Sequence, residues 1–378
     1  MIYLDSAATS FQKPPAVERA MVEALHEMSS PGRGGYPTAM RAAETALECR
    51  IQIQELFSAQ SPEQVIFTMN ATHALNIAIK SLVPRGGRVV ISGYEHNAVT
   101  RPLRALQAKV TVADSPLFRP EEAASAFEKA IRPETDAVIC SHVSNVFGFI
   151  QPIDEIAETC RKKGVPLIVD ASQSAGILPL NMRELGAAFV AMPGHKGLYG
   201  PQGTGVLLCG EISHTLPLLE GGTGSLSAQQ EMPDFLPDRL EVGTHNMPGI
   251  AGLLAGVRFI RASGLRSVSE WDKKMAAIAA EGLNEIPGLQ VFASPDFLAQ
   301  SGVVSFLCKR VDTERMAALL GERGIAVRAG LHCAPLAHRS AGTLQSGTVR
   351  ASFSVFNTEE EVRLFVEEVA RIFKENIE

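Results

Sequence analysis

The sequence has no excess of basic residues, and this absence argues against nucleic acid as a partner. Its 378 residues include 35 lysines and arginines against 41 aspartates and glutamates, which leaves a net charge of −6. The basic residues form no block, whereas nucleic-acid-binding chains concentrate them on one face or in one tract. With 46% hydrophobic and 20% charged residues, the composition is that of a globular protein. It excludes a disordered, collagen-like or coiled-coil chain.

Long apolar runs and closely spaced cysteines are also missing. No run reaches the roughly 18 apolar residues needed to span a bilayer, and the start, MIYLDSAATS, lacks the basic and apolar parts of a signal peptide. The six cysteines lie far apart and form no CxxC pair, which argues against a zinc site or a disulfide framework. We therefore expect a soluble, cytoplasmic protein with reduced thiols, no bound metal and no membrane partner.

Between residues 60 and 210, short apolar runs alternate with helical stretches. Several runs are nearly continuous valine, isoleucine and leucine, which is typical of strands covered on both faces. The predicted strands are Val65–Thr68, Arg88–Gly93, Lys109–Ala113, Ala137–Val143, Leu167–Asp170, Phe189–Met192 and Gly205–Cys209. Helices are expected between several of them, such as Thr72–Leu82 and Pro120–Ile131. This alternation predicts a mostly parallel sheet of the α/β class, with ligands at the carboxyl ends of its strands.

After residue 210 the pattern changes, and we predict a smaller α+β unit. Residues 220–250 are rich in glycine, proline and threonine, so we expect a long structured loop there. The elements predicted after it are a helical stretch over 250–284, strand Val303–Leu307, helix Thr313–Arg323, strand Ile325–Ala329, loop 330–347 and strand Val349–Val355. A final helix begins after Thr358, because Glu361 completes a capping box. Its predicted apolar face consists of Val362, Phe365, Val369 and Phe373.

A single lysine, Lys196, follows the run Phe189–Met192 within a glycine-rich turn. Most loop lysines are merely solvated, but a lysine held at the carboxyl end of a strand can have a lowered pKa and a nucleophilic amine. Asp170 ends another apolar run at the same predicted edge, where capping of a following helix is an equal alternative. Pyridoxal 5'-phosphate (PLP) requires two such groups. A lysine forms a bond with its aldehyde, and a carboxylate keeps its pyridinium nitrogen protonated.

Two further segments are predicted at the same edge. Asn70-Ala-Thr-His-Ala-Leu-Asn76 joins a strand to a helix, and the N–H groups at a helix N-terminus can bind phosphate. A plain N-cap explains this segment equally well. Gly93-Tyr-Glu-His-Asn97 follows a second strand and places His96 where its ring can stack on a flat cofactor, although a lone histidine is more often structural.

Together these motifs make the sequence resemble the class V aminotransferase-fold proteins, specifically the cysteine desulfurase and selenocysteine lyase family in its group II form. The resemblance extends from Leu4-Asp-Ser-Ala-Ala-Thr9 to Arg350-Ala-Ser-Phe353. It implies a type I PLP-dependent transferase fold, with a large, mostly parallel seven-stranded domain and a smaller C-terminal α+β domain, assembled as a homodimer. The expected large domain is residues 12–250, and the expected smaller domain is residues 1–11 with 251–378.

The resemblance also implies a role for each matched residue. Lys196 would bond the aldehyde of PLP, Asp170 would pair with the ring nitrogen, and Gln173 would lie beside the ring hydroxyl. His96 would stack on the ring and assist proton transfer. The implied phosphate contacts are Ala71, Thr72, His195 and, from the neighbouring subunit, Thr244. The implied substrate contacts are Asn145, Arg328 and Arg350, of which Arg350 would hold the substrate carboxylate with its bidentate guanidinium.

Cys333 decides the reaction that the resemblance implies. It lies in Arg328-Ala-Gly-Leu-His-Cys-Ala-Pro335, where we expect His332 and Arg328 to favour the thiolate. The matching cysteine of group II desulfurases takes the sulfur of the substrate, so the implied reaction converts L-cysteine to L-alanine and leaves a persulfide on Cys333. The persulfide would then pass to an acceptor protein or a small thiol. We interpret the other five cysteines as core or incidental residues.

Three positions depart from the family pattern. Pro193 replaces a serine that helps bind phosphate, Leu331 replaces a histidine next to the active cysteine, and Ala71 replaces a threonine. Two alternatives stay open: another PLP reaction, such as selenocysteine lysis, β-elimination or transamination, and a catalytically weak PLP-binding or partner-binding protein. Cysteine desulfuration should need Cys333, whereas selenocysteine lysis and transamination often should not. The full set of matched catalytic residues argues against a role in binding alone.

Overall fold

A computed structural model describes residues 1–32, 34–211 and 214–376, and in it the seven apolar runs before residue 210 form one sheet. The strand order is β2-β8-β7-β6-β5-β3-β4. Neighbouring strands are parallel except at β8, which runs antiparallel to both β2 and β7. The strands are β2 (Val65–Thr68), β3 (Arg88–Ser92), β4 (Lys109–Ala113), β5 (Ala137–Ser141), β6 (Leu167–Asp170), β7 (Phe189–Pro193) and β8 (Gly205–Cys209). The predicted α/β fold with a mostly parallel seven-stranded sheet is confirmed.

Helices cover both faces of this sheet, because its central strands carry apolar side chains on both sides. Val89 and Ile91 of β3 pack with α3 and α4 on one face, whereas Val90 packs on the other face with the cluster that includes α2, α5, α6, α7 and α8. These helices and α1, which packs on α8, are α1 (Pro15–Glu27), α2 (Pro37–Phe57), α3 (Ala71–Leu82), α4 (Asn97–Ala105), α5 (Pro120–Ala130), α6 (Ile153–Lys163), α7 (Met182–Leu185) and α8 (Met247–Ser263). A single 3₁₀ turn, η1 (Pro62–Gln64), precedes β2.

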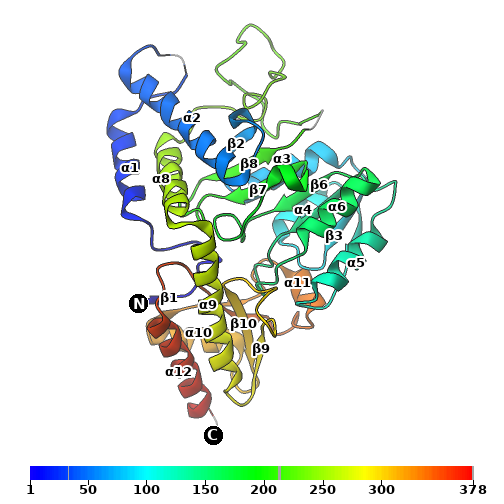
Figure 1. Cartoon of the computed structure of the whole chain (residues 1–378), viewed down its shortest axis with the longest axis vertical. Coiled ribbons are helices and arrows are strands. Elements are labelled where there is room, and N and C mark those ends of the chain that lie inside the picture. Colours follow the sequence, from blue (N-terminus) through cyan, green and yellow to red (C-terminus); the bar gives the residue numbers. More distant parts are fainter. Residues whose placement is uncertain (33, 212–213, 377–378) are drawn as a thin grey trace.

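A second, antiparallel sheet forms from the C-terminal part of the chain, with the order β12-β13-β10-β9. Its strands are β9 (Leu289–Phe292), β10 (Val303–Cys308), β12 (Arg328–Gly330) and β13 (Thr348–Ser352), and its helices are α9 (Leu265–Asn284), α10 (Thr313–Glu322) and α12 (Glu359–Glu375). The capping box between Thr358 and Glu361 is present, and the predicted apolar face of α12 is buried. The N-terminus returns to this region, because β1 (Ile2–Tyr3) pairs in parallel with β11 (Ile325–Ala326) (Figure 1). The assignment of residues 1–11 to the smaller domain, and the boundary at residue 250, stay predictions.

The structure corrects four local predictions after residue 250. The helical stretch is two helices, because the backbone at Gly264 has a φ of 78° and breaks the helix between α8 and α9. The single strand predicted over 325–329 is two strands, because β11 pairs with β1 while β12 pairs with β13. The predicted loop 330–347 contains a short helix, α11 (Pro335–Ser340), and the strand β9 has no counterpart among the predictions. β9 has only four residues, of which Phe292 alone is fully buried, so it gives too short a pattern to predict a strand.

A buried ion pair fixes the start of the segment that leads into α8. Both carboxylate oxygens of Glu241 accept from the guanidinium of Arg50 on α2, at 2.8 and 2.7 Å. The same carboxylate accepts from the backbone N–H of Phe67 on β2 and contacts His245 at 3.1 Å. One charged group therefore joins α2, the edge strand β2 and the loop before α8.

We predict that Arg50→Ala lowers the free energy of unfolding by about 3 kcal/mol, because it leaves the buried Glu241 carboxylate without its guanidinium partner. Urea-induced unfolding of the variant and the wild type measures the difference. The matched control is Arg258→Ala, which removes an exposed ion pair with Glu48 and should cost less than about 1 kcal/mol. Equal losses in the two variants would contradict this account of the Arg50 pair.

Candidate active site

A cavity of about 180 Å³ lies at the carboxyl ends of the parallel strands, where the fold predicts a ligand site. Its walls come from the segments that follow β2, β3, β5, β6 and β7. Eight of the predicted site residues line it: Ala71, Thr72, His96, Asn145, Asp170, Gln173, His195 and Lys196. The sequence motifs and the sheet topology thus converge on one site.

Lys196 is mostly buried in the turn that follows β7. Burial lowers the pKa of its amine to about 8, and the positive charge of Arg350 acts in the same direction, whereas the carboxylate of Asp170 opposes the shift. Glycine is required around this turn, because a Cβ atom at Gly197 would collide with the backbone carbonyl of Ala175. About half of the amine is therefore neutral near pH 8, and the neutral form is the one that attacks an aldehyde.

The N-terminal segment holds the Lys196 turn in place. The Ser10 hydroxyl lies 2.9 Å from the carbonyl oxygen of His195 and 3.1 Å from that of Lys196. The Lys13 amine donates to the Ser10 hydroxyl at 2.7 Å and to the same His195 carbonyl at 3.2 Å. The Thr9 hydroxyl contacts the His195 ring at 3.0 Å. Sequence reasoning missed these three residues, although Thr9 belongs to the N-terminal motif that it singled out.

Asp170 and Gln173 lie on the adjacent loop, after β6. Asp170 is buried, and its Oδ1 accepts from the backbone N–H of Ser172 at 2.9 Å. No helix follows Asp170 directly, so the alternative role as a helix cap does not apply. The Gln173 amide donates to the carbonyl of Ala7 at 3.0 Å, which ties this loop to the N-terminal segment as well.

His96 is the N-cap of α4, and its ring is oriented by that helix. The Nδ1 atom accepts from the backbone N–H of Ala98 at 3.0 Å, so Nε2 carries the proton in the neutral ring. Burial lowers the pKa of the ring. The preceding residue, Glu95, is fully buried and accepts from Ser92 and from the backbone and hydroxyl of Ser141. Burial raises the pKa of Glu95 to about 7; sequence reasoning did not single out this carboxyl group.

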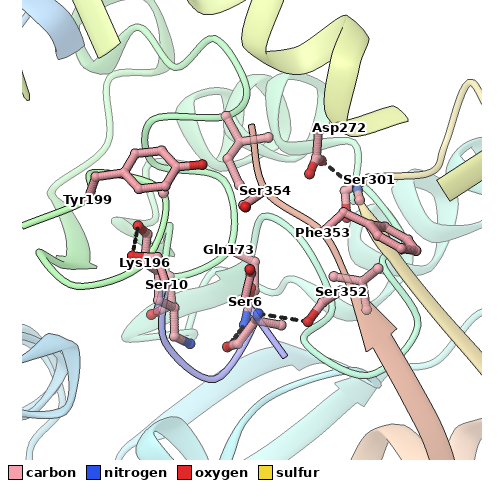
Figure 2. Close-up of a pocket in the computed structure, with 16 residues that line it drawn as sticks. Ser6, Ser10, Gln173, Lys196, Tyr199, Asp272, Ser301, Ser352, Phe353 and Ser354 are labelled. Atoms are coloured by element: carbon pink, nitrogen blue, oxygen red, sulfur yellow. Dashed lines mark hydrogen bonds between the residues drawn. The ribbon is translucent and has the colours of Figure 1, made fainter. Parts of the chain in front are cut away.

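A second, narrower cavity of about 20 Å³ lies on the other side of Lys196, which borders both cavities. Its walls carry hydroxyl groups and the buried carboxyl of Asp272, as Figure 2 shows. Its volume is that of about one water molecule. Burial raises the pKa of Asp272 to about 7, and the carboxylate accepts from the backbone N–H of Gly302. Polar groups therefore surround Lys196 on both sides.

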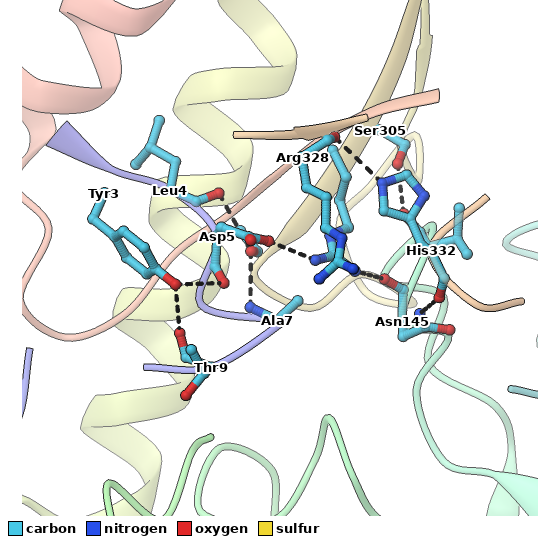
Figure 3. Close-up of polar contacts among 12 residues, drawn as sticks. Tyr3, Leu4, Asp5, Ala7, Thr9, Asn145, Ser305, Arg328 and His332 are labelled. Atoms are coloured by element: carbon cyan, nitrogen blue, oxygen red, sulfur yellow. Dashed lines mark hydrogen bonds and ion pairs between the residues drawn. The ribbon is translucent and has the colours of Figure 1, made fainter. Parts of the chain in front are cut away.

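Arg350 lies beside the main cavity, on β13. Its guanidinium pairs with the Asp5 carboxylate at 2.6 Å and donates to the carbonyl of Asn145 at 2.9 Å (Figure 3). Asn145 lines the cavity and donates from its own amide to the carbonyl of His332 at 2.8 Å. Arg328 faces Arg350 in the register of β12 and β13 and is exposed. The predicted substrate contacts thus form one connected group.

Cys333 lies in the loop between β12 and α11 and is the exposed cysteine among the six. The backbone of the loop takes up left-handed conformations at His332 and Cys333, with φ values of 50° and 56°. The carbonyl of Cys333 accepts from the N–H of Asn97 at 2.8 Å, which holds the loop against the start of α4, next to His96.

The expectation that His332 favours the thiolate of Cys333 is wrong, whereas the contribution expected of Arg328 stays a prediction. Burial, and to a smaller extent the positive charge of Arg350, lower the pKa of His332 to about 2. The ring is therefore neutral and contributes no positive charge that would favour a thiolate at Cys333. The other cysteines are unsuited to nucleophilic chemistry: Cys49, Cys140, Cys160 and Cys209 are buried, Cys308 is partly buried, and burial raises the pKa of Cys49 and Cys160 to about 12.

Four predicted site residues do not line the main cavity: Arg328, Arg350, Cys333 and Thr244. Of these, Thr244 belongs to a different part of the surface. It is exposed and lines a separate cavity of about 250 Å³, together with residues that follow β2 and residues of the loop before α8. The contact of Thr244 with a neighbouring subunit's site stays a prediction.

Comparisons with known proteins identify the family. The class V aminotransferase family model matches residues 2–365. The chain belongs to the class V aminotransferase family. A "probable cysteine desulfurase" of Methanothermobacter thermautotrophicus is 34% identical over 98% of this chain and 94% of that protein. Another protein so named, from Mycolicibacterium paratuberculosis, is 31% identical over 98% of this chain, which spans only 55% of that longer protein.

A solved structure agrees with the sequence comparisons. The apo structure of a cysteine desulfurase from Thermococcus onnurineus superposes with a TM-score of 0.91 at 32% identity, and the match covers 99% of this chain and 95% of the other. The predicted resemblance to the cysteine desulfurases of class V is therefore confirmed over nearly the whole length.

Among the described residues, no helix is both long and apolar enough to cross a bilayer. The same residues contain no group of three or more histidine, cysteine, aspartate or glutamate side chains placed to hold a metal ion. Pro193, one of the three departures from the family pattern, lines the main cavity and offers neither a hydroxyl nor a backbone N–H.

Modification of the Lys196 amine should depend on pH with a midpoint near its shifted pKa. Since protonation removes the nucleophile, reductive methylation of Lys196 by formaldehyde should be slow at pH 6, rise through a pH of about 8 and level off above it. Peptide mass spectrometry of the protein without added cofactor measures the extent of reaction. A midpoint near the ordinary lysine value of about 10.4 would contradict the burial argument.

Proposed function

We propose that this chain is a PLP-dependent cysteine desulfurase that converts L-cysteine to L-alanine and receives the sulfur on Cys333. The observation that carries the proposal is the position of Cys333: the exposed cysteine lies on a loop tied by Asn97 and Asn145 to the cavity that contains Lys196. The relatives that bear the name cysteine desulfurase support the same activity.

The side chains around the cavity have the chemistry that PLP requires. Lys196 offers an amine whose pKa is lowered to about 8, Asp170 offers a carboxylate for the ring nitrogen, and His96 offers a flat ring. Gln173 would hold the ring hydroxyl. The phosphate would be held by the start of α3 at Ala71 and Thr72, by His195, and by Thr244 of a second subunit. When bound, PLP supplies an aldehyde for exchange with the substrate amine and an electron sink for the substrate α-carbon.

The residues of the chain then divide the work of proton transfer and orientation. Arg350 would hold the substrate carboxylate, with Asn145 at the cavity wall and Arg328 nearby. The Lys196 amine, once released by the substrate, is placed to take the proton from the α-carbon, because it lies in the cavity with a pKa near neutral. The Nε2–H of His96 is a proton donor in the cavity, since Nδ1 accepts from the Ala98 N–H.

Sulfur transfer requires no external oxidant or reductant. The Cys333 thiolate attacks the substrate sulfur, so that a new S–S bond forms while the bond from the substrate β-carbon to sulfur breaks. The electron pair of that bond stays on carbon, which takes up a proton and becomes the methyl group of alanine. Overall, L-cysteine and the Cys333 thiol give L-alanine and the Cys333 persulfide.

The alternative is another reaction of the same family, such as selenocysteine lysis, transamination or β-elimination. Pro193, Leu331 and Ala71 depart from the desulfurase pattern in the phosphate site and beside Cys333, and these departures keep the alternative open. The two functions differ in their need for Cys333.

We further propose that the protein acts in the cytoplasm as a homodimer and passes its sulfur to an acceptor protein or a small thiol, with no nucleic-acid partner.

Cys333→Ser should lower the rate of alanine formation from L-cysteine by about 100-fold or more, because it removes the nucleophile. The assay measures alanine and sulfide together, with PLP and a reducing thiol present. Cys308→Ser is the matched control, since Cys308 is partly buried outside the cavity, and it should keep wild-type activity. Equal activity of the Cys333 variant and the wild type would reject this function and direct the search to selenocysteine and other amino acids.

A further inference from the structure

The guanidinium of Arg350 already has an anionic partner within the chain. Arg350 is 2% exposed, and its Nη2 lies 2.6 Å from Oδ1 of Asp5. Its Nη1 donates to the carbonyl of Asn145 at 2.9 Å, and its buried Nε has no hydrogen-bond partner. One face of the guanidinium is thus paired with a carboxylate before any substrate arrives.

The backbone of Asp5 is held in place by its neighbours in the fold. The carbonyl of Asp5 accepts from the backbone N–H groups of Ala8 and Thr9, at 3.0 and 3.4 Å, and from the Tyr3 hydroxyl at 3.2 Å. Asp5 also forms a β-bridge with Ser352, two residues after Arg350 on the same chain segment. Figure 3 shows the Tyr3 hydroxyl joined to the carbonyls of both Asp5 and Thr9. The backbone of Asp5 is therefore fixed beside Arg350, at a distance that lets the carboxylate reach the guanidinium.

A substrate carboxylate that approaches Arg350 meets this fixed negative charge. A guanidinium shared by two carboxylates binds each of them less well than a guanidinium with a single partner, because the two anions repel each other in a site of low dielectric constant. Arg328, which lies opposite Arg350 in the strand register, supplies a second positive charge, but it is exposed and screened by solvent. Repulsion from Asp5 is therefore only partly offset.

We propose that Asp5 is a specificity-determining residue: it acts as an internal counter-ion of Arg350 with which the substrate carboxylate must compete. The Asp5 carboxylate limits the free energy that the substrate carboxylate contributes to binding. The proposal rests on the proposed role of Arg350 as the substrate-carboxylate site. In the free protein, the same ion pair prevents Arg350 from being a buried, unpaired charge.

The experiment compares two ligands that differ at the carboxylate alone. L-alanine carries the carboxylate and no sulfur, so it cannot react with Cys333, and L-alaninamide carries a neutral amide instead. The dissociation constants of both for the PLP-loaded protein are measured by calorimetry. In Asp5→Asn, which keeps the size and a hydrogen-bond acceptor but removes the charge, L-alanine should bind about tenfold more tightly, which corresponds to about 1.4 kcal/mol. L-alaninamide should bind as it does to the wild type.

Tyr3→Phe is the matched control, because it removes a hydroxyl that contacts the Asp5 backbone without a change of charge at Arg350. It should not tighten the binding of L-alanine. Unchanged or weaker binding of L-alanine to Asp5→Asn would overturn the proposal, and so would equal tightening of both ligands.

Arg350→Gln separates this proposal from the proposed function. If it weakens L-alanine binding while Asp5→Asn fails to tighten it, the proposal for Asp5 alone is overturned. If it leaves L-alanine binding unchanged, the assignment of Arg350 as the carboxylate site fails, and the proposal for Asp5 fails with it.

If Asp5→Asn does not fold, the binding of both ligands to the wild-type protein still tests the proposal. L-alanine should then bind no more than about tenfold better than L-alaninamide, and a larger ratio would overturn the proposal.

Discussion

The hydrogen bonds between the N-terminal segment and the loops at the edge of the large sheet hold the cavity together. Ser10 contacts the carbonyls of His195 and Lys196, Ala7 accepts from Gln173, and Asp5 pairs with Arg350. Each contact joins residues more than 160 positions apart in the chain. A few N-terminal residues thus fix the amine, the loop beside Asp170 and the guanidinium relative to one another.

Burial of ionisable groups sets the chemistry of the site. It lowers the pKa of Lys196 to about 8 and raises those of Glu95 and Asp272 to about 7. The pKa values of an amine and of carboxyl groups, which normally differ widely, thus become similar. Buried histidines such as His332 become neutral. The negative charge of Asp170 and the positive charge of Arg350 act on Lys196 in opposite directions. The environment thus favours proton exchange near neutral pH rather than fixed ionic states.

Much of the fold and part of the site follow from local sequence patterns. All seven strands of the large sheet are apolar runs, and Asp170, His96 and Lys196 meet in the cavity because each follows a strand that ends at the same edge. The division of 325–329 into two strands depends on partners at opposite ends of the chain, which no local pattern encodes. The same holds for Asp5, Ser10 and Glu95, whose roles arise from tertiary contacts. Family resemblance supplied the roles of Thr244 and Arg350, which spacing alone does not predict.

The most direct test of the account is to locate the sulfur after a single turnover. PLP-loaded protein is mixed with one equivalent of L-cysteine, alkylated without reductant and analysed by peptide mass spectrometry. The account predicts one extra sulfur atom on the peptide that contains Cys333 and an equal amount of L-alanine in solution. Alanine without any sulfur on Cys333, or sulfur on another cysteine such as Cys308, would contradict it.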